Sequence, residues 1–215
     1  MTSIEVVYVT SSPFKAEENE IFRSQWRMAS GSRVDEVYRF SLREVAIAEV
    51  LEVSIEKMVK HEVKSAYSRL RVPCVVEHAG LVFGDYADKN YPGGLTKPMW
   101  NTLGLEFITE TQSAGRSAIA RAAVGYCDGQ TTYAFVGETL GKISSEPRGD
   151  RSFYWDTIFV PDDDNPDGMT YAEIVAHPKM GLAHKVLRQS QSSRAMAAFL
   201  EWRLTHRPQL WQVSF

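Results

Sequence analysis

The start of the chain alternates between apolar runs and polar breaks. Ile4 to Val9 is rich in β-branched residues, which is typical of a buried strand, and the polar residues Thr10 to Pro13 end it. Residues Lys15 to Met28 favour a helix with an uneven apolar stripe, and Val34 to Phe40 predicts a second strand. The sequence therefore predicts that the chain opens with a strand, a polar turn and a helix.

The clearest helical pattern begins at Ser54. The Ser54 side chain is suited to cap a helix, and apolar residues then recur at helical spacing from Ile55 to Leu70. Pro73 to Glu77 predicts a short apolar strand that ends on a charged residue. A long loop containing Pro92-Gly93-Gly94 follows, and a short helix is expected from Met99 to Leu103.

The second half of the chain predicts a hairpin and then helices. Ser117 to Cys127 and Thr132 to Ile143 flank Asp128-Gly129, a pair of residues that favours a tight hairpin turn. Thr157 to Val160 predicts another short strand, and Thr170 to Thr205 predicts two helices separated near His177. Strand-helix alternation followed by a hairpin favours an α/β fold with a central mixed sheet flanked by helices. We expect residues 1–215 to form a single domain.

Composition narrows the class of protein. The chain has 215 residues, 44% of them hydrophobic and 24% charged, with a formal net charge of −3. A slightly acidic chain does not favour a nucleic acid as partner, and no apolar run is long enough to span a bilayer. Cys74 and Cys127 both lie in apolar stretches, where reduced core thiols are expected. Together with an N-terminus that lacks the pattern of a signal peptide, this predicts a cytoplasmic protein.

Seven short motifs are spread over the chain and are densest between residues 147 and 185. They are Val7-Tyr-Val-Thr10-Ser-Ser12-Pro-Phe-Lys15, Leu42-Arg-Glu44, Pro73-Cys-Val-Val-Glu77-His78-Ala-Gly80-Leu81, Pro92-Gly93 with Lys97, Gly141-Lys-Ile143, Pro147-Arg-Gly149 with Phe153-Tyr-Trp155-Asp156, and Thr170-Tyr-Ala-Glu173 with Lys179 and Ala183-His184-Lys185. In sequence and order these motifs resemble those of the inosine triphosphate pyrophosphatase family, and the resemblance covers essentially the whole chain.

The resemblance implies an inosine triphosphate pyrophosphatase-like fold of two lobes with a cleft that binds a purine nucleoside triphosphate. The first loop and the helix after it would hold phosphate through backbone N–H groups and the positive end of the helix. Phe153 would stack on the purine, and cationic donors would face the keto group of hypoxanthine or xanthine. The implied phosphate contacts are Thr10, Ser12, Lys15, Lys97 and Lys179. The implied base contacts are Phe153, Trp155, Asp156, His184 and Lys185.

The departures from the family pattern lie mostly at residues that the resemblance implies in catalysis and base binding. The family holds Mg²⁺ with acidic side chains and the phosphates, and here Glu44 and Glu77 remain as the implied metal ligands and catalytic carboxylates. His78 stands where the family has an Asp next to the Glu, and an imidazole is a poor Mg²⁺ ligand, although it can act as a general base. Tyr154 replaces a Gly, and Lys185 replaces an Arg. A lysine lacks the planar guanidinium that donates two parallel hydrogen bonds.

Two functions are compatible with this pattern. The first is a nucleotide sensor that binds deoxyinosine, inosine or xanthosine triphosphate, hydrolyses it slowly or not at all, and signals to an effector protein, as in an antiviral or nucleotide-signalling system. The second is an active Mg²⁺-dependent pyrophosphatase that uses Glu44, Glu77 and His78. The resemblance also implies a homodimer.

Ordinary explanations remain open for each residue taken alone. The first loop is also compatible with a plain β-to-α turn, the lysines with surface charges, and the aromatic residues with a core. The Thr-Ser-Ser-Pro segment resembles the start of the Maf-like nucleotide pyrophosphatases too, but the block from Phe153 to Lys185 does not fit that group. A structural subunit that binds no nucleotide is a further alternative.

Overall fold

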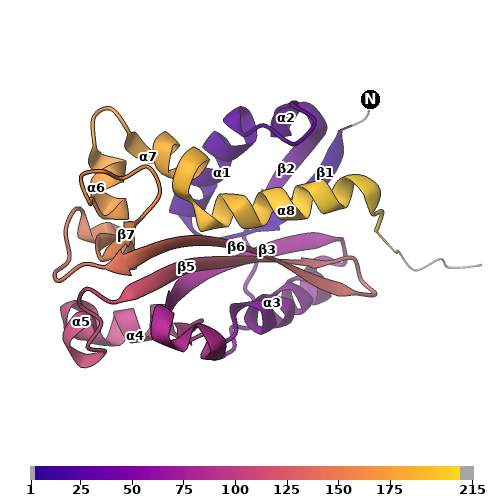
Figure 1. The fold of residues 1–215 in the computed structure, drawn as a ribbon. Helices are drawn as coiled ribbons and strands as arrows, with labels where there is room; N and C mark the ends of the chain where they lie inside the picture. Colours follow the sequence, from indigo (N-terminus) through magenta and orange to yellow (C-terminus); the bar gives the residue numbers. More distant parts are fainter. Residues whose placement is uncertain (1–2, 209–215) are drawn as a thin grey trace, which may run out of the picture.

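The computed structural model describes residues 3–208, apart from the side chains of Arg151 and Phe153. Within this part, a seven-stranded mixed sheet runs through the centre of the molecule in the order β2-β1-β3-β5-β6-β7, with β4 beside β3 (Figure 1). β1 is parallel to β2 and β3, whereas the pairs β3-β5, β5-β6 and β6-β7 are antiparallel. The strands are β1 Ile4–Val9, β2 Tyr38–Arg43, β3 Cys74–Phe83, β4 Pro92–Gly93, β5 Ser117–Cys127, β6 Thr132–Ile143 and β7 Phe159–Pro161.

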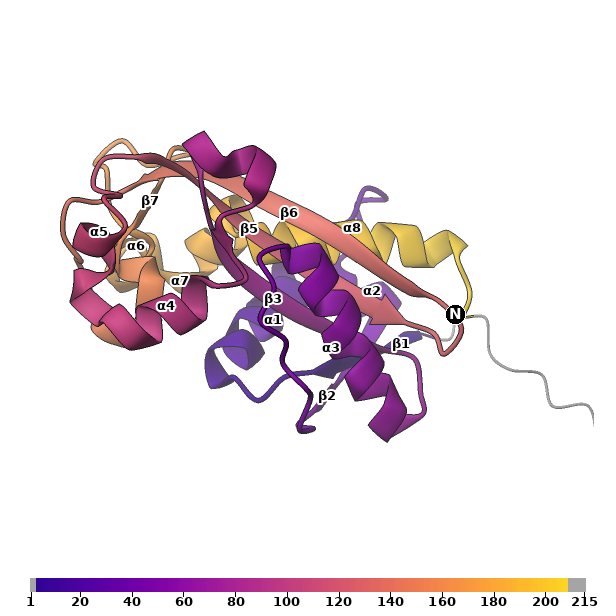
Figure 2. The same cartoon turned by 90° about the horizontal axis from the view of Figure 1, so that it is seen from below.

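Helices cover both faces of this sheet. α8 lies along β5 and β6 on one face, and α3 packs against β3 and β5 on the other, where Figure 2 shows it in front of the sheet. The long helices are α1 Pro13–Gln25, α3 Ile55–Leu70 and α8 Gln191–Thr205. The short helical segments are α2 Val34–Val37, η1 Gly84–Lys89, α4 Thr96–Leu103, η2 Gly104–Glu106, α5 Phe107–Glu110, η3 Arg151–Thr157, α6 Tyr171–Ala176, α7 Gly181–His184 and the π-turn η4 Lys185–Gln189.

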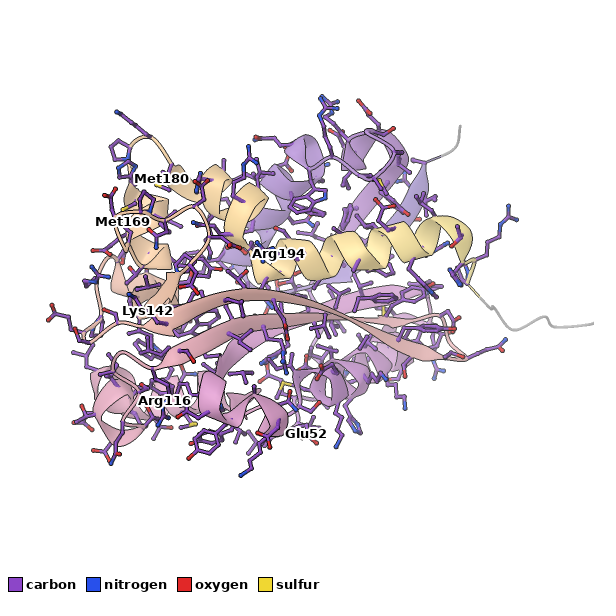
Figure 3. The ribbon with its side chains drawn as sticks, viewed as in Figure 1. Glu52, Arg116, Lys142, Met169, Met180 and Arg194 are labelled. Carbon is purple, nitrogen blue, oxygen red and sulfur yellow. The ribbon has the colours of Figure 1, made fainter. Side chains whose placement is uncertain are left out.

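The start of α8 is fixed to the sheet and to a neighbouring loop. Arg194 donates hydrogen bonds to the carbonyl of Glu138 on β6 and to the Asp163 carboxylate. Figure 3 shows Arg194 at this end of α8, above the sheet, and Glu52 below the sheet. A Cβ added to Gly137 would lie 2.1 Å from the Gln191 carbonyl oxygen, so β6 and α8 approach each other as closely as glycine permits. This anchoring holds the first turn of α8 beside β3.

Several predicted elements are confirmed. β1 has the predicted bounds, and α3 begins after Ser54, whose side chain accepts a hydrogen bond from the backbone N–H of Lys57. The hairpin of β5 and β6 also has the predicted bounds, and the Asp128 carboxylate accepts two backbone hydrogen bonds in its turn. These elements were predictable because local residues alone determine them.

Other predicted bounds are wrong. Residues 34–37 form the short helix α2, because Glu36 accepts a hydrogen bond from the backbone N–H of Arg33 at its start, and the strand runs from Tyr38 to Arg43. β3 continues six residues past Glu77 to Phe83, because β5 pairs with it along its whole length. The last region contains α6, α7, the π-turn η4 and α8 instead of two helices, although the predicted break at His177 is present.

None of the helices among residues 3–208 combines the length and the apolar character needed to cross a bilayer.

Candidate nucleotide-binding cleft

A cavity of about 570 Å³ opens where β1 and β3 separate. The two strands pair only as far as Tyr8 and Val75, and β3 then continues alone on that side through Glu77 and His78. The first loop and α1 follow the carboxyl end of β1, which is where ligands bind in open α/β sheets. Residues from the first loop, β3, α3, α4, η3, η4 and α8 line the cavity.

The first loop is folded by its own side chains. The backbone N–H of Ser12 donates a hydrogen bond to Thr10 Oγ1, and Ser12 Oγ caps α1 by accepting from the backbone N–H of Lys15. Pro13 occupies the first turn of the helix, where its missing N–H costs nothing. The structure therefore brings all three residues predicted in this loop, Thr10, Ser12 and Lys15, to the cavity.

The half-buried Lys15 forms an ion pair with the buried Glu77 on the wall of the cleft. Lys15 Nζ lies 2.6 Å from Glu77 Oε2 and 2.5 Å from the Glu77 carbonyl oxygen. Glu77 Oε2 also accepts a 3.5 Å hydrogen bond from Tyr8, and Oε1 accepts one of 2.9 Å from Ser192. Burial alone would raise the pKa of Glu77, but the Lys15 ammonium and the hydrogen bonds from Lys15 and Ser192 outweigh it and lower that pKa. Glu77 is therefore an ionised carboxylate with both oxygens engaged.

The Lys15–Glu77 pair predicts a pH-dependent contribution to stability. The folded-state pKa of Glu77 lies below its ordinary value of 4.5, so the stabilisation is present above pH 4.5 and is lost as the pH falls through the folded-state pKa. Replacing Lys15 with Met leaves a buried carboxylate without its cation, so the free energy of unfolding at pH 7 should fall by about 2 kcal/mol. Urea unfolding at pH 7 and pH 3 measures this, with the exposed Lys60→Met as control. An equal loss at both pH values would contradict the assignment.

A buried lysine, Lys185, lies at another wall of the cavity. Lys185 Nζ lies 2.5 Å from Asp156 Oδ2 and 2.9 Å from Glu18 Oε1, and it stands 5.1 Å from the centre of the Tyr171 ring. Burial alone would lower the pKa of Lys185, but the carboxylates of Asp156 and Glu18 outweigh it and raise that pKa above its ordinary value. Trp155, which is also buried, lines the cavity beside this group.

The rim beside Trp155 carries an aromatic ring on an unusual backbone. Tyr154 has a φ of 53°, in the left-handed region that glycine favours, and its half-exposed side chain lines the cavity. Its carbonyl accepts a hydrogen bond from Thr157 Oγ1 at the end of η3. The predicted stacking residue Phe153 belongs to the same segment, but its side chain lies outside the described part of the structure.

The imidazole of His78 faces a carboxylate that sequence reasoning missed. His78 Nδ1 lies 3.5 Å from Glu62 Oε1, and both residues line the cavity. Glu62 lies on α3 four residues after Met58 and three after Val59, both of which are buried. A charged residue in the apolar stripe of a helix was the signal that could have identified it, because such a residue is rarely buried without a role. Glu18 and Glu49 also line the cavity and were missed.

The structure brings most, but not all, of the predicted residues together. Lys97 lines the cavity with its Nζ 3.7 Å from Glu49 Oε1. Glu44 follows β2 and Lys179 precedes α7, and both side chains are exposed and do not line the cavity. His184 does not line it either, because its ring turns toward Asp164, with 3.4 Å between Nε2 and Oδ2. The expected convergence of His184 and Lys185 on one ligand is thus present for Lys185 alone.

The predicted metal ligands Glu44 and Glu77 do not form a metal site in the folded chain. Glu77 has both carboxylate oxygens engaged, and Glu44 is exposed away from the cavity. Across residues 3–208, no group of three or more His, Cys, Asp or Glu side chains is arranged to hold a metal ion. The buried thiols Cys74 and Cys127 face each other across β3 and β5 and do not line the cleft.

An open α/β sheet with a cleft at the carboxyl end of its first strand, lined by three lysines and a buried aromatic, defines a small-molecule binding protein of the nucleotide-binding type. The chain belongs to the Ham1 family, whose sequence model matches residues 6–202. This confirms the family resemblance that the motifs predicted.

The relatives are similar over most of their length. The "dITP/XTP pyrophosphatase" of Ignicoccus hospitalis is 32% identical over 193 residues, covering 86% of this chain and 93% of the relative. The protein of the same name from Methanopyrus kandleri is 30% identical over 152 residues, covering 69% and 74%. Among solved structures, a Ham1 protein from Coxiella burnetii superposes with a TM-score of 0.61 at 18% identity, covering 93% of this chain and 99% of that one. The solved structure confirms the predicted fold.

Proposed function

We propose that the cleft binds a deaminated purine nucleoside triphosphate, such as the deoxyinosine, inosine or xanthosine triphosphate. The observation that carries this proposal is the buried Lys185 ammonium, held by Asp156 and Glu18 beside Trp155 in a cavity whose other wall is the first loop. The names of the relatives, which are dITP/XTP pyrophosphatases, support the same substrate class.

The charge arrangement around Lys185 favours a keto group over an amino group. An ammonium has three donors, and the two carboxylates take two of them, which leaves one for the keto oxygen at position 6 of hypoxanthine or xanthine. Adenine would instead direct its amino donor at the ammonium and leave both groups without an acceptor, at a cost of about 1–3 kcal/mol. The remaining oxygens of Glu18 and Asp156 are acceptors for the N1–H, which hypoxanthine and xanthine carry and adenine lacks.

We further propose that the protein acts as a nucleotide sensor whose pyrophosphatase activity is weak or lost. Glu77, which the family pattern implies as a metal ligand and catalytic group, is engaged by Lys15, Tyr8 and Ser192, and the neighbouring position carries His78. The occupied state would be passed to an effector protein, and the chain would act as a homodimer.

An active pyrophosphatase is the second candidate. The relatives are named as pyrophosphatases, and the His78 imidazole beside the Glu62 carboxylate offers a general base at the cleft. In this case Mg²⁺ would supply charge neutralisation at the phosphates when bound. Lys15 and Lys97 would hold the phosphate tail, and Lys185 would orient the base.

Two measurements on one sample test both candidates. Calorimetry with deoxyinosine triphosphate and Mg²⁺ should give a dissociation constant at least about tenfold lower than with deoxyadenosine triphosphate, which corresponds to about 1.4 kcal/mol. The release of pyrophosphate is followed in the same mixture. Binding without release supports the sensor, and fast release supports the enzyme. No binding to either nucleotide would refute the proposed function and favour a structural subunit.

A further inference from the structure

Glu62 is a buried carboxylate that lines two neighbouring cavities. Only 3% of the residue is exposed. It lines the main cleft and also a neighbouring cavity of about 260 Å³. Glu49, Glu62, His78 and Lys97 line both cavities, whereas Trp155, Asp156 and Lys185 line only the first. If the base lies against Lys185, as in the proposed function, Glu62 lies at the phosphate end of the ligand.

The Glu62 carboxylate has few partners that could balance its charge or donate hydrogen bonds to it. Its one side-chain partner within 4 Å among residues 3–208 is the His78 imidazole, with 3.5 Å between Nδ1 and Oε1, and no further side chain there donates a hydrogen bond to the carboxylate. Burying a carboxylate without donors is costly, so such groups are paired, hydrogen-bonded or bound to a metal. A group in the cavity must therefore complete the surroundings of Glu62, and that group has to be a cation or a donor.

The charges of the cleft favour a cation over a neutral donor once a triphosphate is bound. Five carboxylates line the main cavity, namely Glu18, Glu49, Glu62, Glu77 and Asp156, against the three ammonium groups of Lys15, Lys97 and Lys185. Lys15 and Lys185 are already neutralised by ion pairs with Glu77, Asp156 and Glu18. A triphosphate brings several further negative charges, so its tail and Glu62 repel each other unless a cation lies between them.

A hard divalent cation fits this position. Mg²⁺ prefers carboxylate oxygens, keeps several waters, and is commonly bound by one or two carboxylates together with substrate phosphates. Glu62 offers such an oxygen at the cavity wall, whereas Glu77 is engaged and Glu44 is exposed elsewhere. No three described acidic, histidine or cysteine side chains cluster into a metal site, so the phosphates have to supply the remaining ligands.

We infer that Glu62 of α3 is the carboxylate that makes binding of the triphosphate depend on a divalent cation, in place of the Asp that His78 replaces. The inference rests on the proposed function. It adds that the cation site is completed only when nucleotide and metal are both present. A nucleoside monophosphate has no polyphosphate tail to extend to Glu62. Its binding therefore does not depend on the metal.

Calorimetry on the full chain tests this inference. The dissociation constants of deoxyinosine triphosphate and monophosphate are measured with and without Mg²⁺ in the wild type, in Glu62→Gln and in Glu110→Gln. The Glu62→Gln substitution keeps the size of the side chain and removes its charge, and Glu110 is an exposed carboxylate on α5 that does not line the cleft. Mg²⁺ should tighten triphosphate binding at least about tenfold in the wild type and in Glu110→Gln, but less than about threefold in Glu62→Gln.

Binding of the monophosphate distinguishes a failure of the inference about Glu62 from a failure of the proposed function. Its affinity should be the same in all three proteins, which shows that Glu62→Gln folds and keeps its base site. An equal effect of Mg²⁺ on triphosphate binding in the wild type and Glu62→Gln would overturn the role of Glu62 while leaving the proposed function intact. Triphosphate binding that is independent of Mg²⁺ in the wild type would overturn it too. Absence of any nucleotide binding would overturn the proposed function, and this inference with it.

Discussion

Replacing Lys185 with Met should lower the free energy of unfolding at pH 7 by about 3–5 kcal/mol, the cost of removing one partner from a buried ion pair. The variant leaves Asp156 and Glu18 facing each other at the wall of the cleft without their shared cation. Asp156 is buried, and the Lys185 side chain is 7% exposed, so water entering the cleft replaces the ammonium only in part. Urea unfolding of the wild type and the variant measures the loss.

The pH dependence of this loss has a defined sign. The folded-state pKa of Lys185 is raised, so its contribution in the wild type is fully present below the unfolded value of 10.5 and is lost only as the pH rises through the folded-state value. Burial already raises the pKa of Asp156 above its ordinary value, and removing the Lys185 ammonium raises it further, so in Lys185→Met the loss should shrink as the pH falls and Asp156 binds a proton. Lys185→Arg, which keeps the charge, serves as the control. A loss below about 1 kcal/mol at pH 7 would show that the group is not the buried anchor described above.

Replacing His78 with Asp should raise pyrophosphate release from deoxyinosine triphosphate at least about tenfold in Mg²⁺, which corresponds to about 1.4 kcal/mol of activation free energy. The change adds a hard oxygen ligand next to Glu62 and removes an imidazole, which is a poor ligand for Mg²⁺. Two carboxylates in one buried place repel each other, so without metal the variant should be less stable at pH 7 than at pH 5, and Mg²⁺ should stabilise it.

The same substitution at His61 is the matched control, because His61 is an exposed histidine on α3 and does not line the cleft. Release should be unchanged in His61→Asp. An unchanged rate in a folded His78→Asp protein that still binds the nucleotide would show that the missing carboxylate is not what limits hydrolysis.

The sequence was most informative where neighbouring residues determine the structure. The first loop and α1 were predictable because the polar residues Thr10 to Pro13 end β1 and helix-favouring residues follow, although α1 spans Pro13–Gln25 and not the predicted Lys15 to Met28. Likewise, Ser54 and the apolar stripe that follows it determine α3. Motif order was enough to place Lys15, Trp155, Asp156 and Lys185 on one cavity, although no local pattern relates the first of these to the others.

The remaining features depend on contacts between distant parts of the chain. Glu18 pairs with Lys185, 167 residues away, and Ser192 donates to Glu77 across 115 residues, so no local pattern signals either contact. The length of β3 is determined by its pairing with β5, and for this reason a strand predicted to end at Glu77 continues to Phe83. The orientation of His184 toward Asp164 follows from the path of the loop between β7 and α6, which the motif does not encode.

Tyr154 combines an unfavourable backbone conformation with a side chain on the wall of the cleft. A non-glycine residue in a left-handed backbone costs on the order of 1 kcal/mol, and half of this side chain remains in water, so neither backbone preference nor the hydrophobic effect selects tyrosine there. Glycine would adopt the same backbone without that cost. On the wall of the cleft the fold thus accepts a local loss of stability at a position that exposes an aromatic ring to the cavity.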